Sequence, residues 1–186
     1  MKPKVKPVRV PRIETSRLVL RQLTARDVKF VYDLFSLEET NRFVSNPPVK
    51  DMKEAREIYE KYCRPKPYLF RVGIVVKETG EMVGTLGLYA INREDRRATL
   101  GFDLLPAHWG NGYMTEACRA LLDWAFKELE LNRIQASAEP ANLRSLAVME
   151  RLGFTREGVM RQLDYYNGAY HDDVVYSILR EEWANK

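Results

Sequence analysis

The sequence of 186 residues is poor in the residue types that build disulfide frameworks and metal centres, with two cysteines and two histidines. Two cysteines cannot supply the set of disulfides that holds small secreted domains together. The histidines and cysteines also lack the spacing of a zinc site, and no dense carboxylate motif is typical of a calcium site. We therefore expect no bound metal, and we expect Cys63 and Cys118 to be structural.

Long hydrophobic runs are absent as well. The longest nearly apolar stretch, residues 72–76, is far shorter than the roughly 20 residues that a membrane-spanning helix needs. The N-terminus is basic and contains Pro3, Pro7 and Pro11, where a secretory signal would carry an apolar segment. The sequence thus favours a cytoplasmic protein without a membrane partner.

Positive charge is concentrated at the N-terminus. Residues 1–12 carry five lysines and arginines and no acidic residue, so without them the formal charge changes from +4 to −1. We expect these residues to form a solvated, basic, proline-containing tail, with contact to RNA or a ribosomal surface as the alternative. Residues 13–186 fit a single domain, from which we expect no direct nucleic-acid binding because it lacks excess positive charge.

The hydrophobic period alternates along the chain between two residues, typical of strands, and about 3.6 residues, typical of helices. Strands are expected at residues 18–20, 68–76, 82–91, 98–105, 133–138, 159–166 and 170–179, and helices at 28–35, 51–62, 115–129 and 143–151. Residues 38–50 are expected to be a loop or a broken helix. Helices between an antiparallel meander and a final hairpin indicate an α+β fold rather than a doubly wound parallel sheet.

The segment with the most chemical information is residues 104–117, in which a strand leads through a loop with two glycines into a long helix. Backbone amides in the first turn of a helix have no partner within the helix, and the helix dipole favours negative charge there. Gly110 and Gly112 allow a ligand to approach the backbone without hindrance from a Cβ atom. The pattern predicts an anion site, with a plain strand–helix turn as the alternative; it matches neither the P-loop nor the dinucleotide fingerprint.

This loop resembles that of the GCN5-related N-acetyltransferase (GNAT) superfamily, in which a Gln/Arg-x-x-Gly-x-Gly/Ala loop after the fourth strand binds the pyrophosphate of acetyl-coenzyme A. The loop of one branch, the ribosomal-protein N-terminal alanine acetyltransferases, is similar to Trp109-Gly110-Asn111-Gly112-Tyr113-Met114-Thr115-Glu116-Ala117. Two residues depart from the superfamily pattern, because Trp109 replaces Gln or Arg and Met114 replaces the last small residue.

Two further blocks follow in the order of that branch. The first, similar to the helix beside the pantetheine arm, is Asn142-Leu143-Arg144-Ser145 with Met149-Glu150-Arg151-Leu152-Gly153-Phe154. The second comprises Glu157-Gly158, Arg161, Asn167-Gly168, Tyr170, Asp172 and Tyr176-Ser177. The resemblance covers residues 13–184. It implies a GNAT fold with a mixed, mostly antiparallel sheet of about seven strands, flanked by helices and splayed between the fourth and fifth strands.

The resemblance also implies a reaction, the direct attack of a primary amine on the thioester of acetyl-coenzyme A (acetyl-CoA). A backbone amide near Leu104 or Leu105 is expected to bind the thioester carbonyl oxygen. The residues expected to bind the co-substrate are Leu104, Leu105, Trp109, Gly110, Asn111, Gly112, Tyr113, Met114, Asn142 and Ser145.

Asp164 stands where some members of the branch carry a catalytic glutamate, which makes it the expected general base, acting directly or through a water. The alternatives are that Asp103 or Glu139 is the base, or that Asp164 is a solvent-facing strand residue. Ser145 matches the residue proposed in the branch to protonate the leaving sulfur, but a serine there can also cap a helix. Asn142 has the same two interpretations, binding of pantetheine or the start of the helix.

The resemblance therefore favours an N-acetyltransferase whose acceptor is the α-amino group of a protein, such as the N-terminus of a ribosomal protein. A small amine (a polyamine, an amino acid or an antibiotic) is the enzymatic alternative. An acetyl-CoA sensor without turnover is the alternative from a different class. The sequence does not distinguish a monomer from a homodimer.

Overall fold

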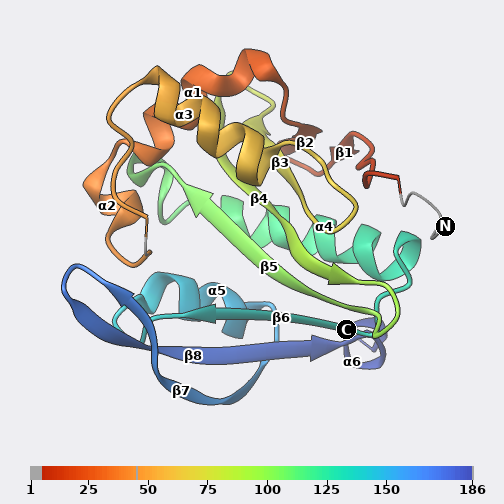
Figure 1. Cartoon of the computed structure of the whole chain (residues 1–186). Helices are drawn as coiled ribbons and strands as arrows, with labels where there is room; N and C mark the ends of the chain where they lie inside the picture. Colours follow the sequence, from red (N-terminus) through yellow and green to blue (C-terminus); the bar gives the residue numbers. More distant parts are fainter. Residues whose placement is uncertain (1–5, 45, 186) are drawn as a thin grey trace, which may run out of the picture.

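The computed structural model describes residues 6–44 and 46–185, in which eight strands form one mixed sheet. The strands lie in the order β1-β2-β3-β4-β5-β6-β8-β7, and every neighbouring pair is antiparallel except β5 and β6 (Figure 1). Their bounds are β1 Ile13–Glu14, β2 Leu18–Gln22, β3 Phe70–Val76, β4 Met82–Asn92, β5 Arg97–Leu104, β6 Arg133–Ala138, β7 Thr155–Tyr166 and β8 Ala169–Leu179.

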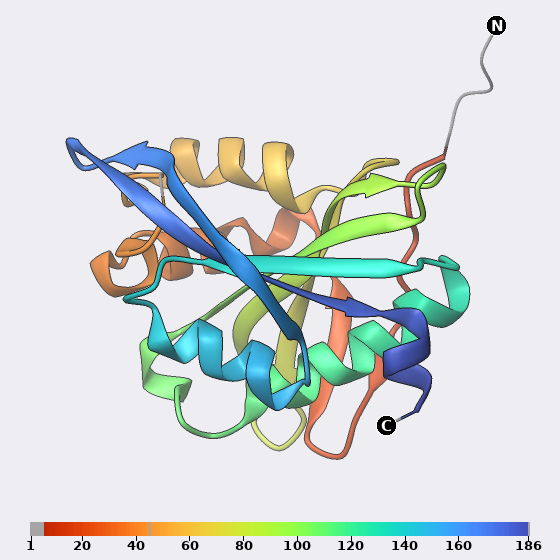
Figure 2. The same cartoon turned by 90° about the horizontal axis from the view of Figure 1, so that it is seen from below.

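Helices cover both faces of this sheet, with α3 on one side and α4 and α5 on the other (Figure 2). The helices are α1 Val28–Phe35, α2 Glu38–Asn41, α3 Met52–Ile58, α4 Tyr113–Glu128, α5 Leu143–Arg151 and α6 Arg180–Ala184. Ala117, Leu121 and Ala125 of α4 are fully buried, because side chains four residues apart share one face of a helix. A smaller apolar cluster joins α1 to α3 on the opposite side.

All seven expected strands are present, which confirms the α+β class and the mostly antiparallel sheet. The eighth strand, β1, has two residues and pairs with β2. The sequence did not predict it because two residues are too few to show a hydrophobic period. β7 also begins earlier than residue 159, at Thr155, and the short helix α2 lies within residues 38–50, which were expected to be a loop or a broken helix.

The sheet splits between β5 and β6, which are the fourth and fifth of the expected strands. Their parallel pairing comprises Arg97 with Arg133, Ala98 with Ile134 and Thr99 with Gln135. Beyond these pairs β5 continues to Leu104 and β6 to Ala138, and Figure 1 shows the two strands diverging as a V from their paired end. The expected splay is confirmed, and it opens the sheet beside the loop that precedes α4.

Residues 6–12 lie against the domain rather than in solvent. Val8 and Val10 are 3% and 8% exposed and belong to the main apolar cluster. The expectation of a solvated tail is therefore wrong for this segment, because alternate residues along it reach the core. Residues 1–5 lie outside the described part of the chain.

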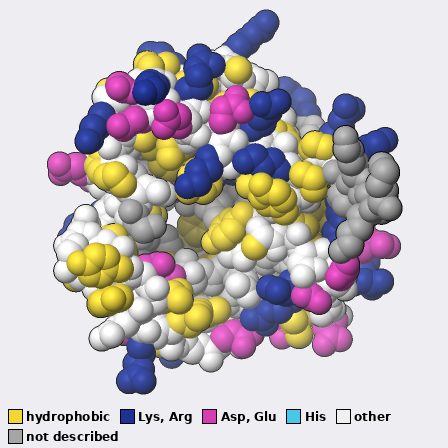
Figure 3. Space-filling model, viewed as in Figure 1, with side chains coloured by type: hydrophobic (Ala, Val, Ile, Leu, Met, Phe, Trp, Pro, Cys, Tyr) yellow, Lys and Arg dark blue, Asp and Glu magenta, His cyan; other side chains and the backbone are white. Residues whose placement is uncertain are grey.

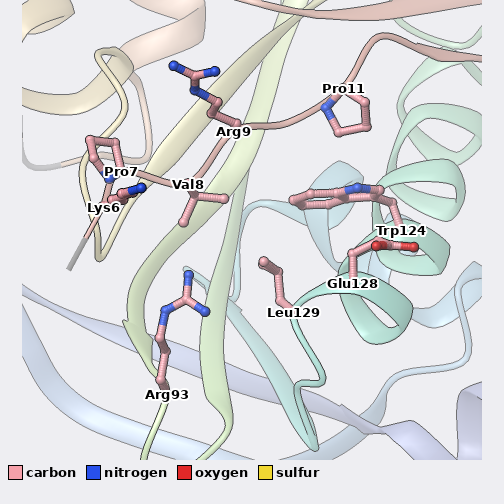
Figure 4. A pocket seen from close by; sticks show the side chains of 9 residues that line it. All are labelled: Lys6, Pro7, Val8, Arg9, Pro11, Arg93, Trp124, Glu128 and Leu129. Carbon is pink, nitrogen blue, oxygen red and sulfur yellow. The ribbon is translucent and has the colours of Figure 1, made fainter.

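The same segment borders a pocket of about 680 Å³ at the C-terminal end of α4. Figure 4 shows Lys6 and Arg9 on one side of this pocket, with Arg93 below them and the indole of Trp124 opposite. The pocket lies at the other end of α4 from the glycine loop, and so apart from the split in the sheet.

Candidate active site

A cleft of about 1290 Å³ occupies the split between β5 and β6. Its walls come from β5, the start of α4, α5, the end of β6 and the segment around α2. Figure 3 shows a hollow near the middle of the molecule, with hydrophobic side chains around it. Since pockets for drug-sized molecules usually measure about 300–1,000 Å³, this cleft has room for a long co-substrate together with an acceptor.

The open edge of β5 presents backbone amides to the cleft. The N–H of Leu105 donates to the carbonyl oxygen of Val83 on β4 at 2.9 Å, and hydrogen bonding alternates between the two edges of a strand. The N–H groups of Leu104 and Phe102 therefore point to the edge from which β6 has diverged. Of the two amides expected to bind the thioester oxygen, Leu104 remains available and Leu105 does not. Phe102, which the sequence did not single out, offers a second donor.

The loop after β5 has the geometry of an anion site. Gly110 and Gly112 have φ angles of 80° and 75°, values that favour glycine over residues with a Cβ atom. Gly112 is the N-cap residue of α4 and has no side chain to occupy the free amides of the first turn. Trp109 fixes the loop to the strand, because its Nε1–H donates to the carbonyl oxygen of Leu104 at 2.9 Å. The side chain of Met114 is 6% exposed and packs in the main apolar cluster rather than in the loop.

A carboxylate in the first turn of α4 ties this loop to the turn between β1 and β2. Glu116 accepts hydrogen bonds from the hydroxyls of Thr15 and Ser16, at 2.5 and 3.1 Å, and from the backbone N–H of Arg17 at 3.0 Å. The guanidinium of Arg17 donates both to Glu116 and to the carbonyl oxygen of Asn111. Partial burial alone would raise the pKa of Glu116, but these hydrogen bonds together lower it. Glu116 therefore has a structural role as a charged anchor for the loop.

The start of α5 forms the opposite wall of the cleft. The side chain of Asn142 caps the helix by accepting a hydrogen bond from the N–H of Ser145 at 3.3 Å. Since Asn142 supplies the cap, the hydroxyl of Ser145 is not needed for it, and Ser145 lines the cleft. The guanidinium of Arg144 lies 4.5 Å from the ring centroid of Trp109. The sequence did not predict Arg144 as a site residue, but this stacking places its charge beside the glycine loop.

Asp103 is not a free carboxylate. Nη2 of Arg71 donates to Oδ2 of Asp103 in a close ion pair, and the two side chains are 19% and 14% exposed. Oδ2 of Asp103 is therefore already engaged by a guanidinium.

Glu139 is engaged as well. It accepts a hydrogen bond from the hydroxyl of Tyr166 and lies 3.2 Å from Nδ1 of His171, whose ring stacks on that of Tyr166 with a centroid distance of 3.8 Å. Burial and the contact with Glu139 raise the pKa of Tyr166, so its hydroxyl stays protonated. These contacts explain Glu139 as part of the packing next to the turn of the β7–β8 hairpin.

Asp164 is exposed on β7, opposite His171, and is not among the described residues that line the cleft. The strand is irregular just before it, because the pairing register shifts between Met160 and Asp164. Gln162 has a φ of 51°, and its N–H donates to Oδ1 of Asp172 at 2.7 Å. This irregularity is a β-bulge, a feature that changes where the following side chain points.

Asp173, which the sequence did not predict as a site residue, is held closer to the cleft. It accepts a hydrogen bond from the hydroxyl of Ser137 at 2.7 Å, and Ser137 lines the cleft. Burial, together with the like charges of Asp164 and Glu139, outweighs this hydrogen bond and raises the pKa of Asp173. A carboxylate with a raised pKa beside a cleft is typical of a proton-transfer site.

Residues 17–155 match the family model described as an acetyltransferase (GNAT) domain. The chain belongs to the GNAT acetyltransferase family. "Uncharacterized N-acetyltransferase p20" of Bacillus licheniformis is 34% identical over 91% of this chain and 97% of its own length. "Putative ribosomal N-acetyltransferase YdaF" of Bacillus subtilis is 42% identical over 58% of each chain. The crystal structure of spermidine N-acetyltransferase from Vibrio cholerae in complex with CoA and spermine aligns with a TM-score of 0.82 and 25% identity, over 92% of this chain and 100% of that chain.

The protein is thus an N-acetyltransferase of GNAT type, and the cleft is its candidate active site. The residues expected in the site that line the cleft are Leu104, Trp109, Gly110, Gly112, Tyr113, Met114, Asn142 and Ser145. Those outside its lining are Leu105, Asn111 and Asp164. Asn111 nevertheless contributes to the loop, because its side-chain amide donates to the carbonyl oxygen of His108 at 3.2 Å.

Both cysteines of this GNAT acetyltransferase are in the core. Cys63 and Cys118 are fully buried, and burial raises the pKa of both thiols, to about 11 for Cys63. Neither is among the described residues that line the cleft. Within residues 6–44 and 46–185, no group of three or more potential ligands is arranged to hold a metal ion. In the same part of the chain, every helix is too short or too polar to cross a membrane.

Proposed function

We propose that this GNAT acetyltransferase transfers the acetyl group of acetyl-CoA to the α-amino group of a protein, such as the N-terminus of a ribosomal protein. The observation that carries the proposal is the shape of the cleft, which has the glycine loop at the start of α4 in one wall and residues around α2 in another. Figure 1 shows α2 and the turn of the β7–β8 hairpin on the two sides of the open end of the V. An opening of this kind leaves room for the polypeptide that follows the reacting amine. The name of the B. subtilis relative, a ribosomal N-acetyltransferase, supports the same acceptor class.

The residues of the cleft fit acetyl-CoA as co-substrate. The free amides after Gly110 and Gly112, with the charge of Arg144 beside them, would bind the phosphates. The open edge of β5 would bind the pantetheine arm through its backbone. When bound, acetyl-CoA supplies a thioester, an activated acyl group that an amine can attack directly.

Three groups of the chain then act on the reaction. The N–H of Leu104 donates to the thioester carbonyl oxygen, which gains negative charge as the amine attacks. The hydroxyl of Ser145 donates a hydrogen bond to the departing sulfur, so that coenzyme A leaves as its thiolate. Asp164 accepts the proton of the amine through a water, because its side chain lies outside the lining of the cleft.

A small polyamine is the second candidate acceptor. The observation that favours it is the mutual repulsion of carboxylates at the hairpin side of the cleft, where Asp164 and Glu139 both raise the pKa of Asp173. Such a group attracts cations, and the V. cholerae neighbour is a spermidine N-acetyltransferase. A sensor without turnover would bind acetyl-CoA but would not release CoA with any amine.

The test is the release of CoA from acetyl-CoA, followed by thiol detection, across a panel of amines. The panel contains peptides that begin with alanine, serine or methionine, together with spermidine, free amino acids and an aminoglycoside. We expect turnover with peptides. Turnover restricted to spermidine or other small amines would contradict the proposal, and tight binding of acetyl-CoA with no turnover would favour the sensor.

A further inference from the structure

The ion pair between Arg71 and Asp103 lies in the wall of the cleft, on the face of the sheet away from α4. Phe70 and Val72, the neighbours of Arg71 on β3, belong to the main apolar cluster with α4. Because successive side chains of a strand point to opposite faces, Arg71 points to the other face. The glycine loop begins α4, so Arg71 faces the acceptor side rather than the phosphate side of the cleft.

The backbone is shaped to let Arg71 reach Asp103 across an intervening strand. Arg71 is on β3 and Asp103 on β5, and between them Gly87 of β4 is paired with Arg71 on one side and with Gly101 on the other. A Cβ atom on Gly87 would lie 2.0 Å from the backbone oxygen of Phe70, and 2.8 Å from Cα and 2.9 Å from Cγ of Arg71. Any other residue at position 87 would push against the backbone of β3 as well as the side chain of Arg71, so a glycine there permits the close approach of β3 and β4 beneath the ion pair.

The ion pair leaves much of the hydrogen-bonding capacity of this arginine unused. A guanidinium has five N–H donors, and among the described residues Arg71 uses one nitrogen, Nη2, to bind Asp103. Its Nε is buried without a partner among those residues. Nη1 has no hydrogen bond to them either. An arginine with unused donors in the wall of a binding cleft is suited to an oxygen of the ligand.

The charges around Arg71 complement the end of a polypeptide. The pKa of Tyr89, which also lines the cleft, reports the nearby charges. Burial raises it, the cation of Arg71 lowers it, and further increases come from the carboxylates of Asp173, Asp103 and Asp164. Carboxylates attract an amine and a guanidinium attracts a carbonyl oxygen. The first residue of a peptide carries both groups, an α-amine and a carbonyl oxygen two carbons away, whereas a polyamine has no oxygen.

We propose that Arg71 is a specificity-determining residue that donates a hydrogen bond to the first carbonyl oxygen of a polypeptide acceptor while Asp103 holds its guanidinium in place. This inference rests on the proposed function, because it requires an acceptor with a carbonyl next to the reacting amine. It assigns to Arg71 the selection of peptides over polyamines.

The experiment compares two acceptors that differ at this oxygen. One is the best peptide of the panel, and the other is the same peptide with its first peptide bond replaced by a trans-alkene, which removes the oxygen together with the N–H of that bond and adds no charge. Comparison with Arg71→Gln isolates the part due to the oxygen. Both are assayed with the wild type and with Arg71→Gln. Arg97→Gln is the matched control, because Arg97 is an exposed arginine of β5 that pairs with Asp95 outside the cleft.

We expect Arg71→Gln to raise KM for the peptide by about 10-fold or more, the loss typical of a hydrogen bond to a charged group. The kcat and the KM for acetyl-CoA should change little. In the wild type the alkene should be a poorer acceptor by a similar factor, and Arg71→Gln should no longer distinguish the two acceptors. Arg97→Gln should behave as the wild type does.

Other results of this experiment would contradict either the inference about Arg71 or the proposed function. Equal KM values of the wild type for the peptide and the alkene would overturn the inference without the use of any variant. If Arg71→Gln still has a higher KM for the alkene than for the peptide, Arg71 is not the group that contacts this oxygen. The ion pair would then have a purely structural role. Turnover of spermidine but of no peptide would instead overturn the proposed function, and the inference with it. If Arg71→Gln unfolds because Asp103 loses its partner, Arg71→Gln with Asp103→Asn removes both charges and is expected to show the same loss of discrimination.

Discussion

At the scale of single residues, partners from distant parts of the chain set the role of each charge at the site. Glu116 lies in the first turn of α4, where a negative charge complements the helix dipole. Its bonds to Thr15, Ser16 and Arg17 span about a hundred positions and could not be predicted from spacing. Arg71 was missed for the same reason, because its partner Asp103 is 32 positions away and reached across Gly87.

Replacement of Glu116 by glutamine should weaken the connection between the glycine loop and the β1–β2 turn. The pKa of Glu116 is lowered from 4.5 in the folded protein, so its contribution to stability is present above that pH and is lost as the pH falls through the folded-state pKa. We expect Glu116→Gln to lower the free energy of unfolding by about 1 kcal/mol at pH 7. Urea unfolding at pH 7 and pH 4 measures the free energy of unfolding of both proteins. The difference between the wild type and Glu116→Gln should be smaller at pH 4.

Glu94→Gln is the matched control for this prediction, because Glu94 is an exposed carboxylate of the β4–β5 turn. Its free energy of unfolding should follow that of the wild type at both pH values. If the difference in free energy of unfolding between the wild type and Glu116→Gln were the same at both pH values, the effect would not come from the charge of Glu116.

Replacement of Asp164 by asparagine tests the proposed base. We expect kcat to fall by at least about 100-fold at neutral pH, the lower end for loss of a general base, while the affinity for acetyl-CoA stays the same. Steady-state kinetics with the best acceptor measures both quantities, with Asp33→Asn on the exposed side of α1 as control. An unchanged kcat would move the role to Asp173, whose hydrogen bond to Ser137 reaches the lining of the cleft.

At the scale of elements, the strands and helices that the sequence predicted are those with a strong period or a clear end. α5 has the expected bounds of residues 143–151, since Asn142 caps its start and Gly153, with a φ of 73°, follows its end. β1 was missed because it is too short to show a period, and α2 is a short helical piece of the loop or broken helix expected at residues 38–50. The bulge before Asp164 was missed because it depends on a contact with Asp172 on the neighbouring strand.

Gly112→Ala tests the geometry of the loop before α4. A residue with a Cβ atom in the left-handed region costs about 1–2 kcal/mol, and relief of that strain would move the amides proposed to bind phosphate. We expect a higher KM for acetyl-CoA and lower thermal stability. Gly80→Ala is the matched control, because Gly80 has a similar φ of 70° and open space around it, in a turn outside the cleft. It should lose stability without a change in KM, and equal KM effects in the two variants would contradict this role of the loop.

At the scale of the whole molecule, the sequence established the class of fold, and the family resemblance supplied the position of the split in the sheet. The proposed phosphate side of the cleft was recognisable in the sequence because most of its residues form one continuous stretch, from Leu104 to Met114. The acceptor side could not, because Arg71, Ser137 and Asp173 come from three separate strands and meet only after folding. Sequence patterns therefore reveal the co-substrate more readily than the acceptor.

The N-terminal segment shows how composition can mislead at this scale. Its positive charges suggested a solvated tail, yet Val8 and Val10 are 3% and 8% exposed within the main apolar cluster. Truncation of a buried valine to alanine removes two methyl groups, each worth about 0.8 kcal/mol, and leaves a cavity. We therefore expect Val8→Ala with Val10→Ala to lower the free energy of unfolding by about 2–4 kcal/mol.

Arg9→Ala is the control for that pair, because Arg9 is an exposed residue between the two valines. If residues 6–12 are part of the domain, urea unfolding should show one transition in all three proteins, with a lower midpoint in the double-valine variant and a midpoint close to wild type in Arg9→Ala. Equal midpoints for the double-valine variant and the wild type would mean that this segment detaches without cost. The main cluster would then have to be complete without it, although its valines pack with strands β3–β5 and helix α4.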